Sequence, residues 1–364
     1  MSADRFDSIT EVVEEIRAGR MVVICDDEDR ENEGDLIMAA QAVTSESIAF
    51  IVRHSSGIIC QSMTRERLDQ LQLPQMVTDN SESHRTAFTV SVDYKHGTTT
   101  GISAADRART IRALADPASL PSDFARPGHI FPLRYAEGGV LVRAGHTEAA
   151  VDLVRLAGLP ALSGILCEIV NDDGTMKRGA ELFAFARANG LKIGTIADLI
   201  RHRLATEKTV RRAFEREVET EFGRFKLIGY RDALSPLPHF ALVRGQVDDG
   251  APVLARVHVR DTLSDVLHLK GDGGLTVAAA LRRVAAAGRG VVVVLADESD
   301  AADALDRLAA APAAESPQGW RQHGLGAQIL ADLCVTRLTV LGTKRRFLGL
   351  SGFGLEIVGY EAAD

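Results

Sequence analysis

Residues 22–35 read VVICDDEDRENEGD, and this stretch indicates both how the fold begins and where a site lies. The apolar run 22–25 is typical of a short buried strand. The block 26–35 then holds seven acids, one Arg, one Asn and one Gly. Acids this close together repel one another unless a positive group lies among them. Polar loops at strand ends are common ligand sites in α/β proteins, so the block predicts a cation or sugar site, with a solvated turn as the alternative.

A calcium loop of the EF-hand type does not explain the block. Such a loop needs acids at positions 1, 3 and 5, Gly at position 6 and Glu at position 12. Counted from Asp29, Gly34 stands at position 6, but position 12 is Ala40. The pattern therefore excludes this class of calcium site.

Composition excludes several classes of protein. The chain has 364 residues, 46% hydrophobic and 25% charged, which is typical of a globular protein of two or three domains. It has no apolar run of about 20 residues and no secretory signal at its start, so we expect no membrane partner. Four widely spaced Cys argue against a disulfide framework and fit the cytoplasm. With a net charge of −8 and no basic face in view, no nucleic-acid partner is expected.

Hydrophobic periodicity predicts two domains joined by a charged connection. In the first we expect helices at 7–20, 45–53, 64–71, 103–115, 147–157, 179–189 and 195–205 and strands at 21–25, 88–94 and 162–170. Ser8 or Thr10 and Ser103 are the expected N-caps. In the second we expect strands at 240–247, 252–259, 290–296, 338–342 and 354–360, helices near 275–288, 301–311 and 324–333, and a loose loop at 308–319. The predicted boundaries are 1–205, a connection at 206–222, and 223–364.

Two further stretches of the first domain place polar side chains where a ligand could use them. RAGHTE at 143–148 sets Arg143 and Thr147 at the start of a helix, where free N–H groups and an Arg favour a phosphate. His146 within it could equally be a cap or a core residue. CEIVNDDG at 167–174 places Glu168 in an apolar strand, where burial is costly without a partner and moves an acid toward the range useful for proton transfer.

A Pro- and Gly-framed histidine occurs in PGHIFP at 127–132. Taken alone, His129 is best explained as a structural loop residue, because the flanking Pro and Gly favour turns.

Taken together, five stretches resemble one family. They are DDEDRENEGD at 26–35, TTTGISAADRARTI at 98–111, RPGHIFPL at 126–133, RAGHTEAAVDL at 143–153 and LCEIVNDDGTM at 166–176. In this order they resemble 3,4-dihydroxy-2-butanone 4-phosphate synthase of riboflavin biosynthesis, over residues 5–205. The resemblance implies a lyase that converts ribulose 5-phosphate to 3,4-dihydroxy-2-butanone 4-phosphate and formate with Mg²⁺ or Mn²⁺. It also implies a cytoplasmic homodimer with its sites near the interface.

The resemblance also assigns residues. It implies Glu31 and His146 as metal ligands and Glu33 as a ligand for a second ion. It implies His129 and Glu168 as catalytic residues. The substrate-binding set that it implies is Arg30, Glu31, Asp35, Arg143, Ala144, Gly145, His146, Thr147 and Glu168.

Residues 218–360 resemble GTP cyclohydrolase II, but without its chemistry. The resemblance rests on HFALVRGQV, PVLARVHVRD, ALRRVAAAGRGVVVVL, HGLGAQILADL and GFGLEIVGY. Asp261, Gly271 and Gly273 stand where that family has three zinc-binding Cys, and two glycines cannot hold zinc. ADESDA at 296–301 replaces an Arg-containing stretch, and His323 replaces a Tyr. We therefore expect a degenerate domain without zinc or cyclohydrolase activity, with a structural role, or a sensing or docking role, left open.

The expected fold class is α+β: an N-terminal three-layer α/β domain with a mixed sheet and a C-terminal α+β domain like cyclohydrolase II. The expected function is a metal-dependent lyase with an accessory second domain. The alternatives are a regulatory or scaffold protein in which neither half is catalytic, and a bifunctional enzyme. The complete acidic block favours the lyase, and the missing thiolates disfavour the bifunctional enzyme.

Overall fold

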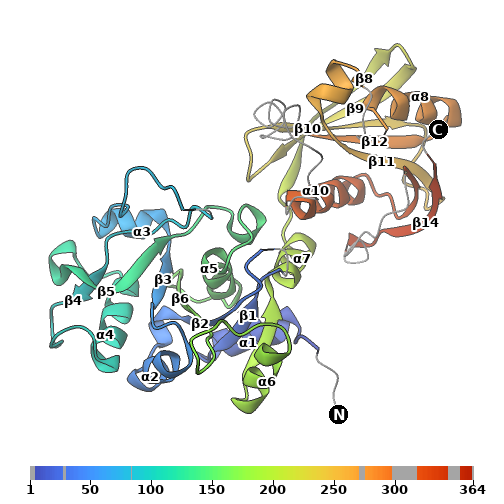
Figure 1. The fold of residues 1–364 in the computed structure, drawn as a ribbon. Helices are drawn as coiled ribbons and strands as arrows, with labels where there is room; N and C mark the ends of the chain where they lie inside the picture. Colours follow the sequence, from blue (N-terminus) through green and yellow to red (C-terminus); the bar gives the residue numbers. More distant parts are fainter. Residues whose placement is uncertain are drawn as a thin grey trace. The chain divides into compact units, whose positions relative to one another are not determined.

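The computed structural model describes residues 5–27, 30–82, 84–269, 275–296, 318–342 and 353–362, and only the backbone of residues 318–323. The chain divides into two compact units, residues 1–202 and 203–364, within helix α7 (Ile196–Thr206). Each unit has its own sheet and its own helices (Figure 1). Among the helices described, none has the length and apolar character needed to cross a membrane.

A seven-stranded mixed sheet forms the centre of the first unit, in the order β4-β5-β3-β6-β2-β1-β7. Its strands are β1 (Val22–Cys25), β2 (Gly34–Ala39), β3 (Cys60–Met63), β4 (Val92–Tyr94), β5 (Phe124–Arg134), β6 (Ser163–Glu168) and β7 (Lys192–Thr195). β2 pairs antiparallel with both β1 and β6, and its Asp35 lies opposite Ile24 on one side and Glu168 on the other. The acidic block thus begins where β1 ends and finishes inside β2.

Helices cover both faces of this sheet. They are α1 (Ile9–Arg17), α2 (Ser45–His54), α3 (Arg65–Gln70), α4 (Ala104–Ala115), α5 (His146–Leu156) and α6 (Ala180–Ala188), with 3-10 turns η1 (Ala40–Ala42), η2 (Pro121–Asp123) and η3 (Gly139–Leu141). One core cluster joins α2, α3, α4 and α6 to Val23, Leu36 and Cys167. Since side chains alternate along a strand, Asp35 and Glu168 point to the opposite face, toward the layer of α1 and α5. The predicted three-layer α/β domain with a mixed sheet is confirmed.

Local capping explains where two of these helices begin. Ser8 accepts from the Glu11 N–H at 3.3 Å, and the Glu11 carboxylate accepts from the Ser8 N–H at 3.1 Å, which completes a capping box. Ser103 accepts from the Asp106 N–H at 3.1 Å. Both N-caps agree with the sequence prediction, Ser8 being one of the two residues proposed for α1.

The stretch 127–132, expected to be a loop, lies within strand β5 instead. The strand pairs parallel with β3 and antiparallel with β4. Pro127 falls where the register with β4 shifts, and Pro132 lies opposite Gln61 of β3. Gly128 is required there, because a Cβ at this position would lie 2.0 Å from the carbonyl carbon of Val92. The Pro and Gly that predicted a turn therefore mark a close approach of two strands.

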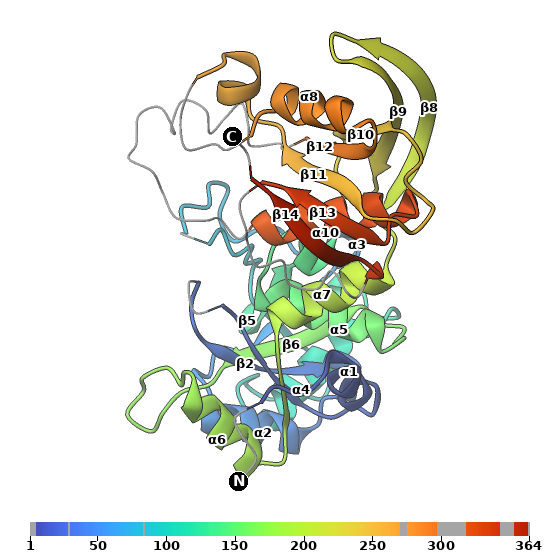
Figure 2. The same cartoon turned by 90° about the vertical axis from the view of Figure 1, so that its right-hand side faces the viewer.

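The second unit is built on another seven-stranded mixed sheet, in the order β14-β13-β11-β12-β10-β9-β8. Its strands are β8 (Val210–Thr220), β9 (Gly223–Asp232), β10 (Pro238–Arg244), β11 (Val253–Val259), β12 (Gly290–Leu295), β13 (Arg337–Leu341) and β14 (Glu356–Glu361). Helix α8 (Val277–Ala287) contacts β10, β11 and β12 (Figure 2), and α10 (Gln318–Asp332) packs with Val291 and Val293 in a separate core cluster. A turn, η4 (Thr262–Val266), follows β11. The α+β class predicted for this half is confirmed.

The segment 206–222, predicted to be a connection, is mostly strand β8. It pairs antiparallel with β9 along Val210–Thr220 and forms one edge of the sheet. Its many charges misled the prediction, since an exposed edge strand is commonly charged to prevent pairing with other chains. The predicted helix at 301–311 and most of the loop at 308–319 lie outside the described residues.

The side chain of Gln328 on α10 forms hydrogen bonds with the backbone of residues 204–209, at the start of the second unit. Its side-chain oxygen accepts from the Thr209 N–H at 2.9 Å. Its amide nitrogen donates to the carbonyls of Glu207 at 2.9 Å and Leu204 at 3.2 Å. Because Gln328 is 6% exposed, water cannot replace these bonds.

Gln328→Leu should therefore lower the free energy of unfolding of the second unit by about 3 kcal/mol, since each buried polar group left unpaired costs about 1–3 kcal/mol. Urea denaturation followed by circular dichroism measures this. Gln246→Leu, at an exposed position of the same unit, is the control and should stay within about 0.5 kcal/mol of wild type. Equal stabilities of the two variants would show that Gln328 has no such role.

Candidate functional site

The loop between β1 and β2 is organised by Asp26. Its carboxylate accepts from the N–H groups of Glu33 at 2.8 Å and Glu31 at 3.2 Å, and it pairs with the Arg30 guanidinium at 2.8 Å. The Asp26 side chain is 1% exposed, so this first acid of the block does not belong to a solvated turn, which was the alternative interpretation of the block. The positive group among the acids is Arg30, which also contacts the Glu31 carboxylate at 2.8 Å.

Three ligand atoms converge beside this loop. One atom each of Asp26, Glu31 and His146 lie within 4.8 Å of one another, and the described residues contain no other such group of three. His146 begins α5 and is buried. Its Nε2 lies 3.1 Å from the Ile24 carbonyl, which can only accept, so Nε2 carries the proton and Nδ1 is the basic nitrogen. Burial lowers the pKa of His146 to about 4, which keeps the ring in the neutral form that binds metals.

Asp35 and Glu168 form the floor of the site as a cross-strand pair. Asp35 is 2% exposed, and burial raises its pKa well above the usual value, with the neighbouring carboxylates adding to the shift. Its Oδ1 is buried and has no hydrogen-bond partner among the described residues. That atom lies 3.8 Å from His146 Nδ1. A buried acceptor without a partner is typical of an atom that completes its contacts with a bound group.

Glu168 is only half-buried, although its apolar strand led us to expect full burial. Its Oε2 accepts from the Ser56 hydroxyl at 2.6 Å, which fixes the direction of the carboxylate. The strand ends at Glu168, so the side chain reaches the rim of the sheet while Cys167 before it is buried in the core. The fully buried acid of the pair is Asp35.

Arg143 lies beside the start of α5 and already has protein partners. Its guanidinium pairs with Glu148 at 2.7 Å and donates to the Thr86 hydroxyl at 3.1 Å. Gly145 makes room for this pair, because a Cβ there would lie 2.6 Å from the guanidinium. Thr147 is buried in the first turn of the helix, next to His146. The N–H groups of that turn still give this end of α5 the positive potential that favours an anion.

Glu33 has a different partner from the one that the family resemblance implied. Its carboxylate lies 3.1 Å from the Arg178 guanidinium, and it is not among the three converging residues. The third converging residue, beside Glu31 and His146, is Asp26. The signal that could have identified Asp26 is its position directly after a buried strand, where an Asp often bonds the backbone of the following turn.

His129 lies on β5, two residues before Phe131, which pairs with Cys60. Glu168 lies two residues beyond Leu166, which pairs with the same Cys60. The pleat therefore turns both side chains to the same face and the same end of the sheet. Among the contacts described for it, His129 bonds Asp93 rather than the acid cluster. Asp93 and Ser56 lie outside the five motifs, so the sequence analysis did not identify either of them as a site residue.

The donor set fits a hard divalent cation. Asp26 and Glu31 offer carboxylate oxygens and His146 offers a neutral imidazole, a combination that Mg²⁺ and Mn²⁺ accept. The site contains no cluster of thiolates, since Cys25 and Cys167 are buried and burial raises their pKa to about 12 and about 11. These residues therefore offer carboxylate and imidazole ligands to a divalent cation and no thiolate.

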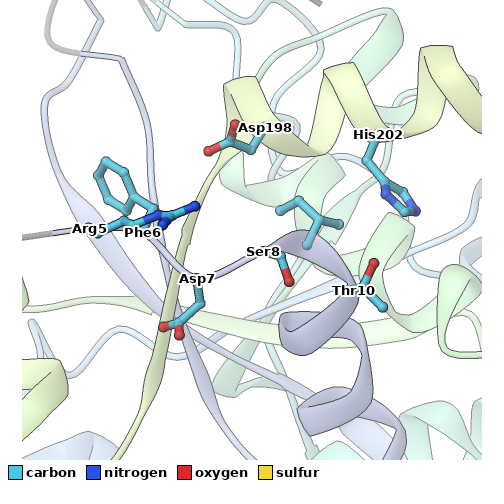
Figure 3. A pocket seen from close by; sticks show the side chains of 8 residues that line it. Arg5, Phe6, Asp7, Ser8, Thr10, Asp198 and His202 are labelled. Carbon is cyan, nitrogen blue, oxygen red and sulfur yellow. The ribbon is translucent and has the colours of Figure 1, made fainter. Parts of the chain in front are cut away.

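A surface depression of about 560 Å³ lies elsewhere on the first unit (Figure 3). It is lined by residues 5–10, Asp198 and His202, and by none of the residues of the candidate site. Asp198 bonds the Thr195 hydroxyl at 2.8 Å at the start of α7. The depression therefore belongs to the packing of the N-terminal segment against α7.

Comparison with known proteins agrees with both halves of the fold. A family model described as 3,4-dihydroxy-2-butanone 4-phosphate synthase matches residues 10–202, and one described as GTP cyclohydrolase II matches residues 210–362. A 3,4-dihydroxy-2-butanone 4-phosphate synthase of Pseudomonas aeruginosa is 48% identical over 98% of this chain and 99% of its own. A relative in Arabidopsis thaliana named a bifunctional riboflavin biosynthesis protein is 48% identical over 97% of this chain and 68% of its own.

Two solved structures are similar as well. A two-domain 3,4-dihydroxy-2-butanone 4-phosphate synthase from A. baumannii has a TM-score of 0.82 and 42% identity, covering 98% of this chain and all of that one. A 3,4-dihydroxy-2-butanone 4-phosphate synthase in complex with two magnesium ions has a TM-score of 0.54 and 52% identity, covering 55% of this chain and 98% of that one. The chain belongs to the 3,4-dihydroxy-2-butanone 4-phosphate synthase family, with a second domain of the GTP cyclohydrolase II type.

Proposed function

We propose that the first unit converts D-ribulose 5-phosphate to 3,4-dihydroxy-2-butanone 4-phosphate and formate, using Mg²⁺ or Mn²⁺. The reaction balances, because the five carbons of the sugar become a four-carbon product and one carbon at the oxidation level of formate. The observation that carries the proposal is the convergence of Glu31, His146 and Asp26 beside the buried, partnerless Oδ1 of Asp35. A sugar with adjacent oxygens, together with a cation, suits that arrangement.

Glu31, His146 and Asp26 are the residues that would hold the cation. The chemistry that a cation would supply there is polarisation of neighbouring sugar oxygens, which would stabilise negative charge on them. Arg30 limits the repulsion between the two carboxylates, because it pairs with both Asp26 and Glu31. The Ile24 carbonyl holds the His146 ring in the tautomer that presents Nδ1.

Proton transfer is assigned to Glu168 and His129. Ser56 directs the Glu168 carboxylate, and a carboxylate held in this way can take a proton from a sugar carbon and return it to an oxygen. Asp35 is placed to bind a sugar hydroxyl, since its buried Oδ1 needs a donor. These roles account for why the acids lie at one end of the sheet.

The sugar phosphate is assigned to the start of α5. Arg143, Ala144, Gly145 and Thr147 form the backbone and side-chain surface of the turn that begins at His146. The Glu148 carboxylate orients the Arg143 guanidinium toward this turn, and the helix N-terminus adds positive potential. The phosphate would thus bind near the cation, so that one small sugar could contact both sites. Glu33 is assigned as a ligand for a second ion. To bind that ion, its carboxylate would exchange the Arg178 guanidinium for the cation.

For the second unit we propose an accessory role without zinc or GTP cyclohydrolase activity. Asp261, which replaces the first zinc-binding Cys, caps η4 by accepting from the Leu263 N–H at 3.2 Å and the Ser264 hydroxyl at 2.9 Å. Gly271, Gly273, the stretch 297–301 and the His323 side chain lie outside the described residues. A bifunctional enzyme is the second candidate, favoured by the GTP cyclohydrolase II match and the bifunctional relative. The missing thiolates argue against it.

We also propose that the protein acts as a cytoplasmic homodimer with its sites near the interface. Ile58 and Ile102 are each 52% exposed, and exposed apolar side chains beside a site suit a subunit contact. Ile58 follows the segment that holds Glu168, and Ile102 follows Gly101, which lies against Asp93. The four Cys, described as free thiols, suit a reducing compartment.

The metal assignment makes the first test of this function. Glu31→Gln and His146→Ala should each reduce turnover to below about 1% of wild type and remove Mn²⁺ binding, because each deletes a ligand of the cation. Mn²⁺ binding is measured by electron paramagnetic resonance, and formate release by a coupled assay. EDTA should stop the wild-type reaction, and Mg²⁺ or Mn²⁺ should restore it.

The same measurement of Mn²⁺ binding shows whether Asp26 or Glu33 contributes more to holding the cation. Asp26→Asn should weaken Mn²⁺ binding more than Glu33→Gln does, since only Asp26 lies in the cluster. Glu66→Gln, at an exposed position on α3, is the control and should change neither measurement. Full activity of the wild type in EDTA would contradict the metal assignment.

Glu168→Gln tests the proton-transfer role. The substitution keeps the size of the side chain and a partner for Ser56 but removes the proton-carrying oxygen. We expect turnover to fall by about 10²–10⁴-fold with substrate binding largely kept, as is typical of general acid–base residues. Steady-state kinetics and ribulose 5-phosphate titration calorimetry provide the two measurements. Turnover within a few-fold of wild type would assign Glu168 a structural role only.

Comparing the activities of the full-length protein and of a chain ending at Ala205 assigns each activity to one unit. Both should release formate from ribulose 5-phosphate, neither should do so from GTP, and elemental analysis should find no stoichiometric zinc. The shorter chain is expected to be less stable, because it ends within α7 and lacks Gly324, which lies against Leu204 in the full chain. One zinc per chain with formate from GTP would establish the bifunctional enzyme.

Sedimentation equilibrium of the same samples tests the homodimer, since a monomer of the full chain is 39.1 kDa. A folded shorter chain without activity would instead show that the second unit contributes to the synthase site.

A further inference from the structure

The His129 side chain has one fixed partner, the Asp93 carboxylate. His129 Nδ1 lies 2.6 Å from Asp93 Oδ2. The backbone N–H of His129 donates to the other oxygen, Oδ1, at 2.9 Å. Both carboxylate oxygens of Asp93 are therefore used on one residue, and the ring cannot turn about its own axis without breaking the shorter bond.

This geometry selects one tautomer of the ring. A carboxylate only accepts hydrogen bonds, so the bond requires the proton of a neutral His129 to lie on Nδ1. The unprotonated Nε2 is then the nitrogen that can accept a proton from a substrate. The His129 side chain is 42% exposed and the Asp93 side chain 14%, so the accessible part of the pair is the ring.

The position of Asp93 is fixed by its surroundings. It lies on β4 and pairs with Ala125 of β5, on the strand that carries His129. A Cβ at Gly101, whose φ is +89°, would lie 2.0 Å from Asp93 Oδ2, so the loop before α4 closes tightly over the carboxylate. A Cβ at Gly128 would lie 2.2 Å from the Asp93 nitrogen. Gly101 thus allows the loop to lie directly against the Asp93 carboxylate, and Gly128 allows β5 to approach the Asp93 backbone.

We propose that Asp93 is the positioning residue for His129, holding the imidazole as the Nδ1–H tautomer with Nε2 basic and turned to the substrate. The inference rests on the proposed function of His129 in proton transfer. It adds a residue outside the acid cluster and the α5 turn, and it explains why the loop at 97–103 carries a glycine directly against Asp93.

A purely structural role for Asp93 gives different expectations. The bond from the His129 N–H to Oδ1 could by itself hold β4 against β5. Asn keeps an oxygen for that bond but replaces Oδ2 by an NH₂ group, which donates to Nδ1 and favours the opposite tautomer. Asp93→Asn therefore preserves the contact between β4 and β5 but favours the opposite tautomer of His129.

The test is Asp93→Asn in the full-length protein, with ¹⁵N NMR of the histidine ring nitrogens and steady-state kinetics with Mg²⁺ present. The His129 signals are assigned as those missing from His129→Gln among the ten histidines. We expect the Nδ1–H tautomer in wild type and the Nε2–H tautomer in Asp93→Asn. We expect kcat to fall by about 10²–10⁴-fold, as happens when such an Asp is replaced in a catalytic triad, while KM changes by less than about 3-fold.

Two controls make the result specific. Asp123→Asn alters a second His–Asp pair, in which His96 Nε2 lies 3.0 Å from Asp123, and it should leave turnover unchanged. The double variant Asp93→Asn/His129→Gln should be no slower than His129→Gln alone, because Asp93 acts only through the ring.

The Nε2–H tautomer in wild type would overturn the inference even if Asp93→Asn fails to fold, since only His129→Gln is needed to assign the signals. Wild-type turnover in a folded Asp93→Asn, or a further loss in the double variant, would also overturn it. If wild type does not convert ribulose 5-phosphate, the proposed function fails, while the NMR measurement still decides whether Asp93 sets the tautomer.

Discussion

The antiparallel pairing of Asp35 with Glu168 is the constraint on which the site depends. It puts two carboxylates side by side at one end of a sheet, and the loop before β2 adds Glu31 and Asp26. Coulomb repulsion and the loss of water both oppose this arrangement, and the raised pKa of Asp35 is the result. Arg30 offsets part of the repulsion. The remainder requires a proton or a cation, so the fold is built to bind positive charge there.

The two units show that sheets of similar architecture can carry different polar side chains at their strand ends. In the first, the polar side chains that lie at strand ends are held by bonds that direct them, such as Ser56 to Glu168 and Ile24 to His146. In the second, the Asp261 carboxylate follows strand β11 and is used to cap a turn. A sheet with helices on both faces needs only its apolar pattern to fold, and this pattern is complete in both units.

Sequence reasoning succeeded where one local rule decides the outcome. Ser8 and Ser103 cap helices because a side-chain oxygen placed before the first turn satisfies a free N–H, whatever lies around it. The motifs likewise brought Glu31 and His146 together across more than a hundred residues, which periodicity alone could not do. The misses concern positions where tertiary pairing decides. The strand through Pro127 and the charged strand β8 exist because a neighbouring strand provides the hydrogen bonds.

The side chains missed at the site have a common property, which is that each holds another residue of the site in place, and Asp26 is in addition one of the three converging residues. Asp26 shapes the turn that carries Glu31, Ser56 directs Glu168, and Asp93 bonds His129. Their types are ordinary for turns and strand ends, so nothing in the sequence separates them from surface residues. Only the pairing register of the strands and the hydrogen-bond distances in the structure identify them. Because Glu31, Glu168 and His129 are held by such contacts, the geometry of this site depends on residues that a motif comparison passes over.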